Sequence, residues 1–185
     1  MDGEHIITDL KELCKNDSLI KSELLDLLKR YAETISVYDQ MMTIARLRKD
    51  GEFITESYSD KYLKIYIENF ILRIKEFLMK NISDDGEINI KSLRDSFPQL
   101  QRCFEKEGAK DFNAEEDKFP LMQVIMSLYT TFIVEESIHP VGSEFPGNLK
   151  IEKRNGKFLC PVKDYQKDNE NAVCNLCIAE QAPNL

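Results

Sequence analysis

The sequence predicts a mainly α protein, in which a bundle of about five or six helices carries a small C-terminal β-hairpin and loop appendage. Two patterns lead to this fold class. Apolar residues recur three and four positions apart through residues 1–138, the spacing of one helix face. Residues 139–185 are interrupted by proline and glycine and lack a long amphipathic stretch. Since 185 residues suffice for about one domain, we expect a helical domain at 1–138 with the appendage, 139–185, packed on it.

The first helices are predicted from apolar stripes and end signals. A stripe over residues 6–13 predicts one helix, and a longer stripe over 18–49 predicts one long helix or two. Asp17 and Ser18 can cap the start of the longer stripe. Gly51 suits the left-handed residue beyond its end.

The clearest helix is predicted over residues 59–80, where apolar and aromatic side chains cover a wide face. So wide an apolar face is typical of a central, buried helix. A short helix is predicted around residues 91–97, and another from Pro98, because proline suits a first helical turn.

The last helix is predicted to open at Phe119 and Pro120, after a charged loop at 108–117, and to run through Ile133. It should end before His139, because the proline that follows disfavours the helical conformation of its predecessor.

The appendage is predicted to contain one β-hairpin. Asn155 and Gly156 form the strongest two-residue turn signal, because both positions of that turn need positive φ. We expect Leu149–Glu152 and Lys157–Cys160 to pair around it. An isolated two-stranded hairpin is marginal in water, so packing on the helices or a metal ion must hold this one.

A metal site is predicted from the cysteines of the appendage. Cys174 and Cys177 have the CxxC spacing that lets two thiolates bind one ion from a single turn, and Cys160 supplies a third. Structural zinc takes four ligands, usually cysteine and histidine. Lys163 stands where a second CxxC motif would have its cysteine, so His139, at the junction of helix and appendage, is the natural fourth ligand.

Other interpretations of the cysteines stay open. Three cysteines with a fourth ligand can also hold an iron–sulfur cluster. Alternatively, Cys160 is a small buried side chain and the CxxC is incidental. A redox dithiol is disfavoured because no βαβ pattern is visible. Cys14 and Cys103 fall in helical patterns and are expected in the core, with Cys103 a reserve ligand.

Two further motifs are weaker. Residues 81–92 resemble the front of a calcium loop, but Ser92 stands where a bidentate glutamate is needed, which favours an ordinary interhelical linker. Glu135 and Glu136, just before His139, are candidates for a general base, for metal ligands, or for carboxylates that accept hydrogen bonds from the metal ligands. A solvated helix end is the more ordinary interpretation.

Charge and hydropathy exclude several classes of function. The chain has 25 basic against 33 acidic residues, a net charge of −8, which argues against nucleic acid and anionic membranes. No apolar run approaches the roughly 20 residues of a membrane span, and the acidic N-terminus lacks a signal-peptide pattern. We therefore expect a cytoplasmic protein with reduced cysteines. The oligomeric state and any protein partner stay open.

The appendage also carries a specific signature. It reads His-Pro-Val-Gly-Ser-Glu-Phe-Pro-Gly from residue 139, Cys-Pro-Val-Lys from residue 160 and Cys-Asn-Leu-Cys from residue 174. This signature resembles a family of archaeal proteins of unknown function, found largely in methanogens. The resemblance implies a cytoplasmic archaeal protein in which His139 and the three cysteines act together, and it implies no reaction.

The sequence thus predicts a non-catalytic, metal-stabilised protein with an interaction or regulatory role. The alternative is a metal-dependent or cysteine-dependent enzyme that uses Glu136, His139 and the cysteines beside the loop at 145–147. A catalytic zinc keeps three protein ligands and a water, so the number of protein ligands separates the two interpretations.

Overall fold

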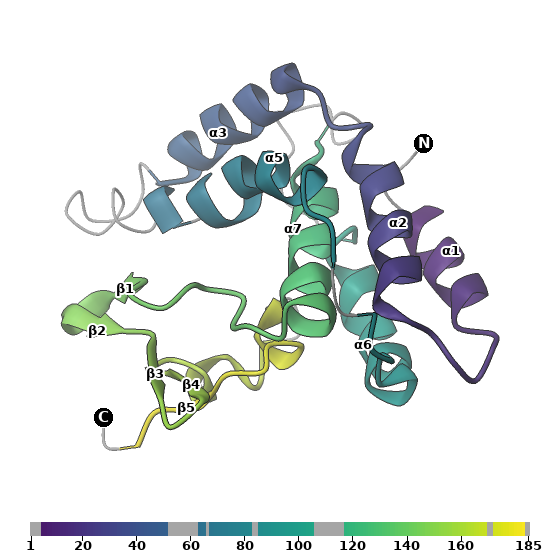
Figure 1. The fold of residues 1–185 in the computed structure, drawn as a ribbon. Coiled ribbons are helices and arrows are strands. Elements are labelled where there is room, and N and C mark those ends of the chain that lie inside the picture. The colour runs from purple at the N-terminus through teal and green to yellow at the C-terminus, as the bar shows by residue number, and fades with distance from the viewer. Residues whose placement is uncertain are drawn as a thin grey trace.

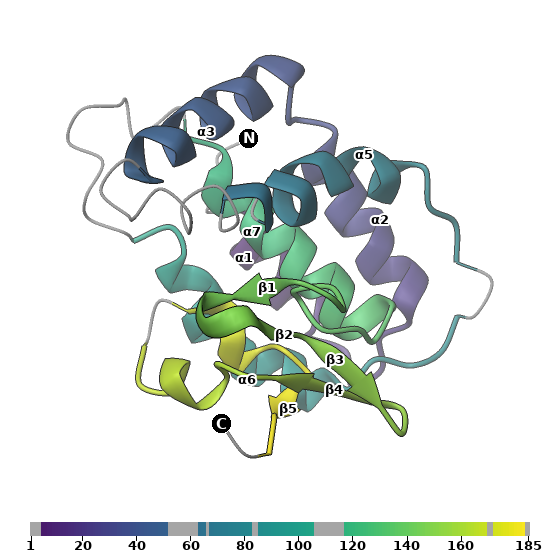
Figure 2. The same ribbon diagram turned by 90° about the vertical axis from the view of Figure 1, so that its left-hand side faces the viewer.

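The computed structural model describes residues 5–51, 63–65, 67–82, 85–105, 117–169 and 172–183, and it is mainly α-helical, as the sequence predicts. The helices form one body, and short strands gather on one side of it (Figures 1 and 2). The α-helices in these ranges are α1 (His5–Leu13), α2 (Lys21–Ala32), α3 (Val37–Gly51), α5 (Arg73–Leu78), α6 (Ile90–Arg102) and α7 (Phe119–Leu128).

Two π-helical turns extend these helices. The turn η1 (Ile67–Leu72) leads into α5, and η3 (Tyr129–Ile133) continues α7, so the last helix runs to the predicted residue and stops before His139. The described part of the C-terminal segment contains the short 3₁₀ turns η4 (Pro146–Asn148), η5 (Asp164–Gln166) and η6 (Val173–Asn175).

Helix α7 lies at the centre of the helical body (Figure 1), where it contacts α2, α5 and η1. All its residues except Pro120 are buried, which an apolar surface on every side of the helix explains. In the described ranges, no helix combines the length and apolar content needed to cross a bilayer.

The predicted helix at 59–80 contributes to the same core. Phe70, Ile74 and Phe77 are each at most 1% exposed, so this segment is deeply buried as expected. Its predicted start at 59–62 lies outside the described residues, as does most of the predicted charged loop at 108–117.

The predicted stripe at 18–49 forms two helices, α2 and α3. Ser36 and Asp39 begin α3 reciprocally: the amide of Asp39 donates to Ser36 Oγ at 3.1 Å, and the amide of Ser36 donates to the Asp39 carboxylate at 2.7 Å. Helix α2 begins at Lys21, later than the Ser18 signal.

Asp85 of the calcium-like loop fixes the start of α2. Its carboxylate accepts hydrogen bonds from the Ser22 amide at 2.8 Å and the Ser22 hydroxyl at 2.9 Å. This use fits the linker interpretation, although residues 83 and 84 of the loop lie outside the described part.

One helix boundary prediction was wrong. The two helices expected around 91–97 and from Pro98 form a single helix, α6, with Pro98 in its interior. Proline cannot donate to the carbonyl of Arg94, which weakens the helix locally. Leu93 and Leu100, two turns apart on one face, are both fully buried and keep the helix continuous.

The strands form two small sheets. In one, β1 (Glu144–Phe145) pairs antiparallel with β2 (Leu149–Lys150). In the other, β3 (Glu152–Arg154) pairs antiparallel with β4 (Lys157–Cys160), and β5 (Glu180–Gln181) adds to β4 in parallel.

The predicted hairpin is confirmed for its inner part. Arg154 pairs with Lys157, and Asn155 and Gly156 between them have φ values of 51° and 80°. The outer part differs, because the Ile151 amide donates to Ser143 O and its carbonyl accepts from the Gly142 amide. Residues 149–151 thus pair with the chain before them rather than with β4.

Substitution of Gly156 by Val should destabilise this hairpin by about 1–2 kcal/mol, because a β-branched residue resists positive φ. Nothing lies within 4 Å of a Cβ added there, so the cost comes from the backbone alone. Hydrogen exchange of the β3 and β4 amides measures it. Gly156→Asn, which tolerates this conformation, is the control, and equal protection in both variants would count against the turn.

Candidate functional site

Cys160 ends strand β4 and begins a tight turn. Its side chain is buried with Phe158 and Ala179 in a small core of the C-terminal segment. Burial raises the pKa of the Cys160 thiol, whereas the backbone N–H groups of Val162 and Lys163 lower it and so favour the thiolate. The turn therefore brings two peptide N–H groups close enough to Cys160 to favour its charged form.

Cys174 and Cys177 lie on a second turn, formed by η6. The Cys177 amide donates to the Cys174 carbonyl at 3.2 Å. Lys163 Nζ donates to the carbonyl oxygens of Cys174 at 2.5 Å and of Cys177 at 2.7 Å. Lys163, the residue that breaks the four-cysteine pattern, thus ties the Cys160 turn to the CxxC turn.

The three cysteines are neighbours. Burial, together with the neighbouring Cys160 and Cys177, raises the pKa of Cys174 to about 11. Cys177 also raises the pKa of Cys160. Even so, no group of three or more His, Cys, Asp or Glu side chains in the described ranges is arranged to hold a metal ion. The structure brings the three cysteines into one region, but it does not place their sulfurs at the spacing of metal ligands.

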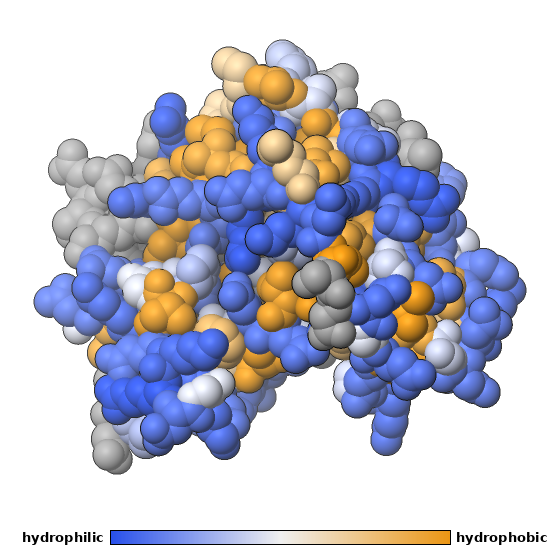
Figure 3. Space-filling model, viewed as in Figure 1, coloured by the Kyte–Doolittle hydropathy of each residue, from blue (hydrophilic) through white to orange (hydrophobic). Residues whose placement is uncertain are grey.

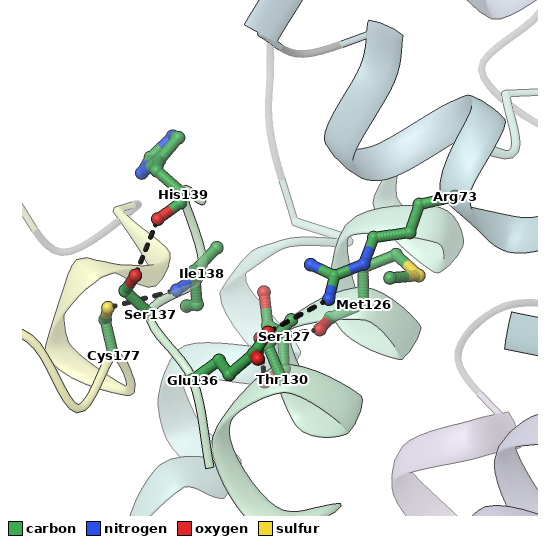
Figure 4. Close-up of polar contacts among 9 residues, drawn as sticks. All are labelled: Arg73, Met126, Ser127, Thr130, Glu136, Ser137, Ile138, His139 and Cys177. Carbon is green, nitrogen blue, oxygen red and sulfur yellow. Dashed lines mark hydrogen bonds and ion pairs between the residues drawn. The ribbon is translucent and has the colours of Figure 1, made fainter. Parts of the chain in front are cut away.

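The chain that follows η3 lies against the CxxC turn (Figure 4). The backbone N–H of Ile138 donates to Cys177 Sγ at 3.3 Å, and Ser137 Oγ donates to the His139 carbonyl at 2.7 Å. Val173, which precedes Cys174, and Leu176, which precedes Cys177, belong to the main helical core. The CxxC turn therefore joins the C-terminal segment to the helical body.

The His139 imidazole points away from Cys177 (Figure 4). It packs edge-on against Phe70 and Phe145, with ring centroids 6.1 and 5.6 Å apart. Burial lowers the pKa of His139 to about 4, so the ring is neutral at pH 7. His139 as a metal ligand stays a prediction, and it requires the ring to leave these aromatic neighbours.

Glu135 and Glu136 form ion pairs with helices rather than pointing at the cysteines. Glu135 adopts a left-handed φ of 53° and lies 2.9 Å from Lys21 Nζ, while Glu136 lies 3.3 Å from Arg73 (Figure 4). These contacts support a structural role at the end of η3.

The other two cysteines lie in the helical core, as expected. Cys14 is 2% exposed and Cys103 is 1% exposed. The Cys103 thiol hydrogen-bonds to the Gln99 carbonyl at 3.6 Å. A role for Cys103 as reserve ligand stays a prediction.

Lys163→Met should destabilise the C-terminal segment by about 2 kcal/mol, because it removes a charged donor from two carbonyls. Chemical denaturation measures this loss. The matched control is Lys167→Met, which breaks only an exposed ion pair with Asp164 and should change stability by less than about 1 kcal/mol. Equal losses in the two variants would show that Lys163 does not join the turns.

Comparison with known proteins shows that the sequence matches one family. The model of a family described as an uncharacterized protein conserved in archaea, DUF2115, matches residues 20–182. A UPF0305 protein of Methanothermobacter thermautotrophicus is 32% identical over 158 residues, which cover 84% of this chain and 92% of the relative. A UPF0305 protein of Methanocaldococcus jannaschii is 28% identical over 165 residues, covering 88% and 97%. No solved structure matches the chain.

Proposed function

This chain belongs to the archaeal family DUF2115, and we propose that it is a non-catalytic interaction protein whose C-terminal segment is held on the helical body by one zinc ion. The proposed ligands are Cys160, Cys174 and Cys177, with His139 as the fourth. The observation that carries the proposal is the supply of peptide N–H donors to cysteine sulfurs at the junction of the two parts.

These peptide N–H groups stabilise a cysteine sulfur that carries negative charge. The backbone N–H groups of Val162 and Lys163 act on Cys160 and lower the pKa of its thiol, and Cys177 Sγ accepts a hydrogen bond from the backbone N–H of Ile138. A neutral thiol is only a weak acceptor, whereas a metal-bound thiolate carries negative charge and gains more from each donor. Hydrogen bonds around ligating atoms are a regular part of metal sites.

Zinc would add a second link between the two turns, beside the hydrogen bonds of Lys163. Among the described residues, the core of the C-terminal segment is small and contains four buried apolar residues, Ile151, Phe158, Cys160 and Ala179. A structural zinc site contributes on the order of 10 kcal/mol to folding, far more than so small a core. The proposal requires the thiolates to close to about 2.3 Å from the ion.

The interaction role rests on exposed apolar side chains of α3. Val37, Tyr38 and Met41 are 59%, 66% and 63% exposed on one face of that helix, and apolar surface is visible over α3 in Figure 3. Clustered apolar side chains at a surface are typical of contacts with another protein.

The second candidate function is a zinc enzyme, and the orientation of His139 favours it. An imidazole that stays between Phe70 and Phe145 leaves three thiolates and a free fourth position for water. An open position is the mark of a catalytic zinc. The two candidates therefore differ in one ligand.

Cobalt titration of reduced, metal-free protein tests the proposal. We expect saturation at one Co²⁺ per chain, with a thiolate charge-transfer band and the intense visible bands of a tetrahedral site. Cys174→Ala should abolish these bands, and Cys14→Ala should leave them unchanged. If no saturable band forms, the proposal fails. His139→Phe separates the candidates: altered visible bands indicate a histidine ligand, and unaltered bands indicate the open, enzyme-like site.

A further inference from the structure

Helix α3 lies at the outer edge of the helical body and packs on η1 (Figure 1). Its inner face buries Thr43 and Leu47, which are 3% and 8% exposed. On the opposite face, the side chains at positions 37, 41, 45 and 48 are exposed and follow one another four, four and three residues apart. Side chains at this spacing are neighbours on a helix, so they form one continuous outer stripe.

The outer stripe has the composition of a protein interface. Tyr38, Met41 and Met42, which lie on it or beside it, are 66%, 63% and 36% exposed. Tyrosine, methionine and arginine are enriched in interfaces relative to the rest of a protein surface. Arg48 lies at the end of the stripe, so all three residue types are present on this one face.

Opposite charges lie at the two ends of the helix. Glu33 lies three residues before Ser36, which begins α3, and Arg48 lies in the last turn. Both side chains are exposed, and neither forms an ion pair with another residue in the described ranges. The surface therefore has an acidic end, an apolar centre and a basic end.

A second copy of this chain is complementary to such a surface. Met41 lies about midway between the two charges, eight residues after Glu33 and seven residues before Arg48. In a two-fold dimer, both copies use the same patch of surface. When two copies of α3 lie antiparallel about an axis near Met41, the acidic end of each lies beside the basic end of the other. A parallel arrangement would place like charges together, which is unfavourable.

We propose that the outer stripe of α3 pairs with the same stripe of a second copy, in an antiparallel two-fold dimer. The two Met41 side chains meet near the axis, Tyr38 and Met42 cover the apolar centre, and Glu33 of each copy pairs with Arg48 of the other. The proposal rests on the proposed function, because it names the partner of the interaction role, but it does not depend on zinc. One helix per copy makes a small interface, so the dimer should be weak, with a Kd in the micromolar range or above.

Sedimentation equilibrium of the full chain, from low micromolar to millimolar concentrations, tests the dimer. We expect a reversible equilibrium between monomer and dimer. Tyr38→Glu should leave monomer at every concentration, because it would bury a carboxylate in the apolar centre. The matched control is Tyr165→Glu, at a side chain of η5 that is 73% exposed, and it should leave the Kd unchanged.

Reversal of the charges tests the antiparallel orientation. Arg48→Glu should raise the Kd about tenfold, because it turns two attractions into two repulsions. The double variant Glu33→Arg, Arg48→Glu should restore the wild-type Kd, since both ion pairs form again with their signs exchanged.

Three results would overturn the proposal. Wild-type protein that stays monomeric at every concentration would assign the face to contact with a different protein. Equal effects of Tyr38→Glu and Tyr165→Glu would place the dimer contact elsewhere, and a double variant no tighter than Arg48→Glu would exclude the antiparallel pairing. The readout is separate from the zinc test: a monomer that forms the cobalt bands contradicts the dimer alone, and a dimer without those bands contradicts the zinc site alone.

Discussion

In zinc-saturated protein, Cys160→Ala should lower the free energy of unfolding by several kcal/mol and abolish zinc binding. Cys160 ends β4, and the peptide N–H groups of the following turn favour its thiolate, so its loss removes one of the proposed ligands. In metal-free protein the same variant should cost only about 1 kcal/mol, because it removes one small buried group.

The comparison of the two states distinguishes ligand loss from a packing defect. Cys14→Ala is the matched control, since Cys14 is also buried but lies in the helical core. Its effect on stability, measured by chemical denaturation, should be the same with and without zinc. If Cys160→Ala also shows no dependence on zinc, Cys160 is a core residue and not a ligand.

Phe77→Ala should destabilise the helical body by about 3–5 kcal/mol, the usual range for removing a buried phenylalanine. Phe77 is 1% exposed and packs edge-on against Tyr129 of η3, with ring centroids 5.0 Å apart. Urea denaturation measures the loss. Met79→Ala, at a side chain that is 86% exposed, should change stability by less than about 0.5 kcal/mol. A loss of stability below about 1 kcal/mol in Phe77→Ala would contradict the deep burial of α5 in the helical core.

The helical part could largely be predicted from the sequence, because helix periodicity is a local signal. The turn at Asn155 and Gly156 was equally local. Pro98 misled the prediction, since its preference for a first turn was outweighed by the burial of Leu93 and Leu100 against distant parts of the chain. Strand β1 was not predicted, because a two-residue strand has no periodicity.

The candidate site was only partly predictable. CxxC spacing and the scarcity of histidine pointed to Cys174, Cys177 and His139, and spacing placed Cys160 with them. The aromatic contact between His139 and Phe70 joins residues far apart in sequence, so no local pattern could reveal it. The role of Lys163 depends on the direction of backbone carbonyls, which is a property of the folded chain.

Metal content tests the central claim most directly. Protein purified without chelators under reducing conditions, then analysed for zinc, iron and acid-labile sulfide, should contain one zinc per chain and no sulfide. Cys160→Ala prepared in parallel should contain none. Iron with stoichiometric sulfide would show that the cysteines bind an iron–sulfur cluster and not zinc. Wild-type protein with no bound metal before or after incubation with zinc would contradict the metal-stabilised account.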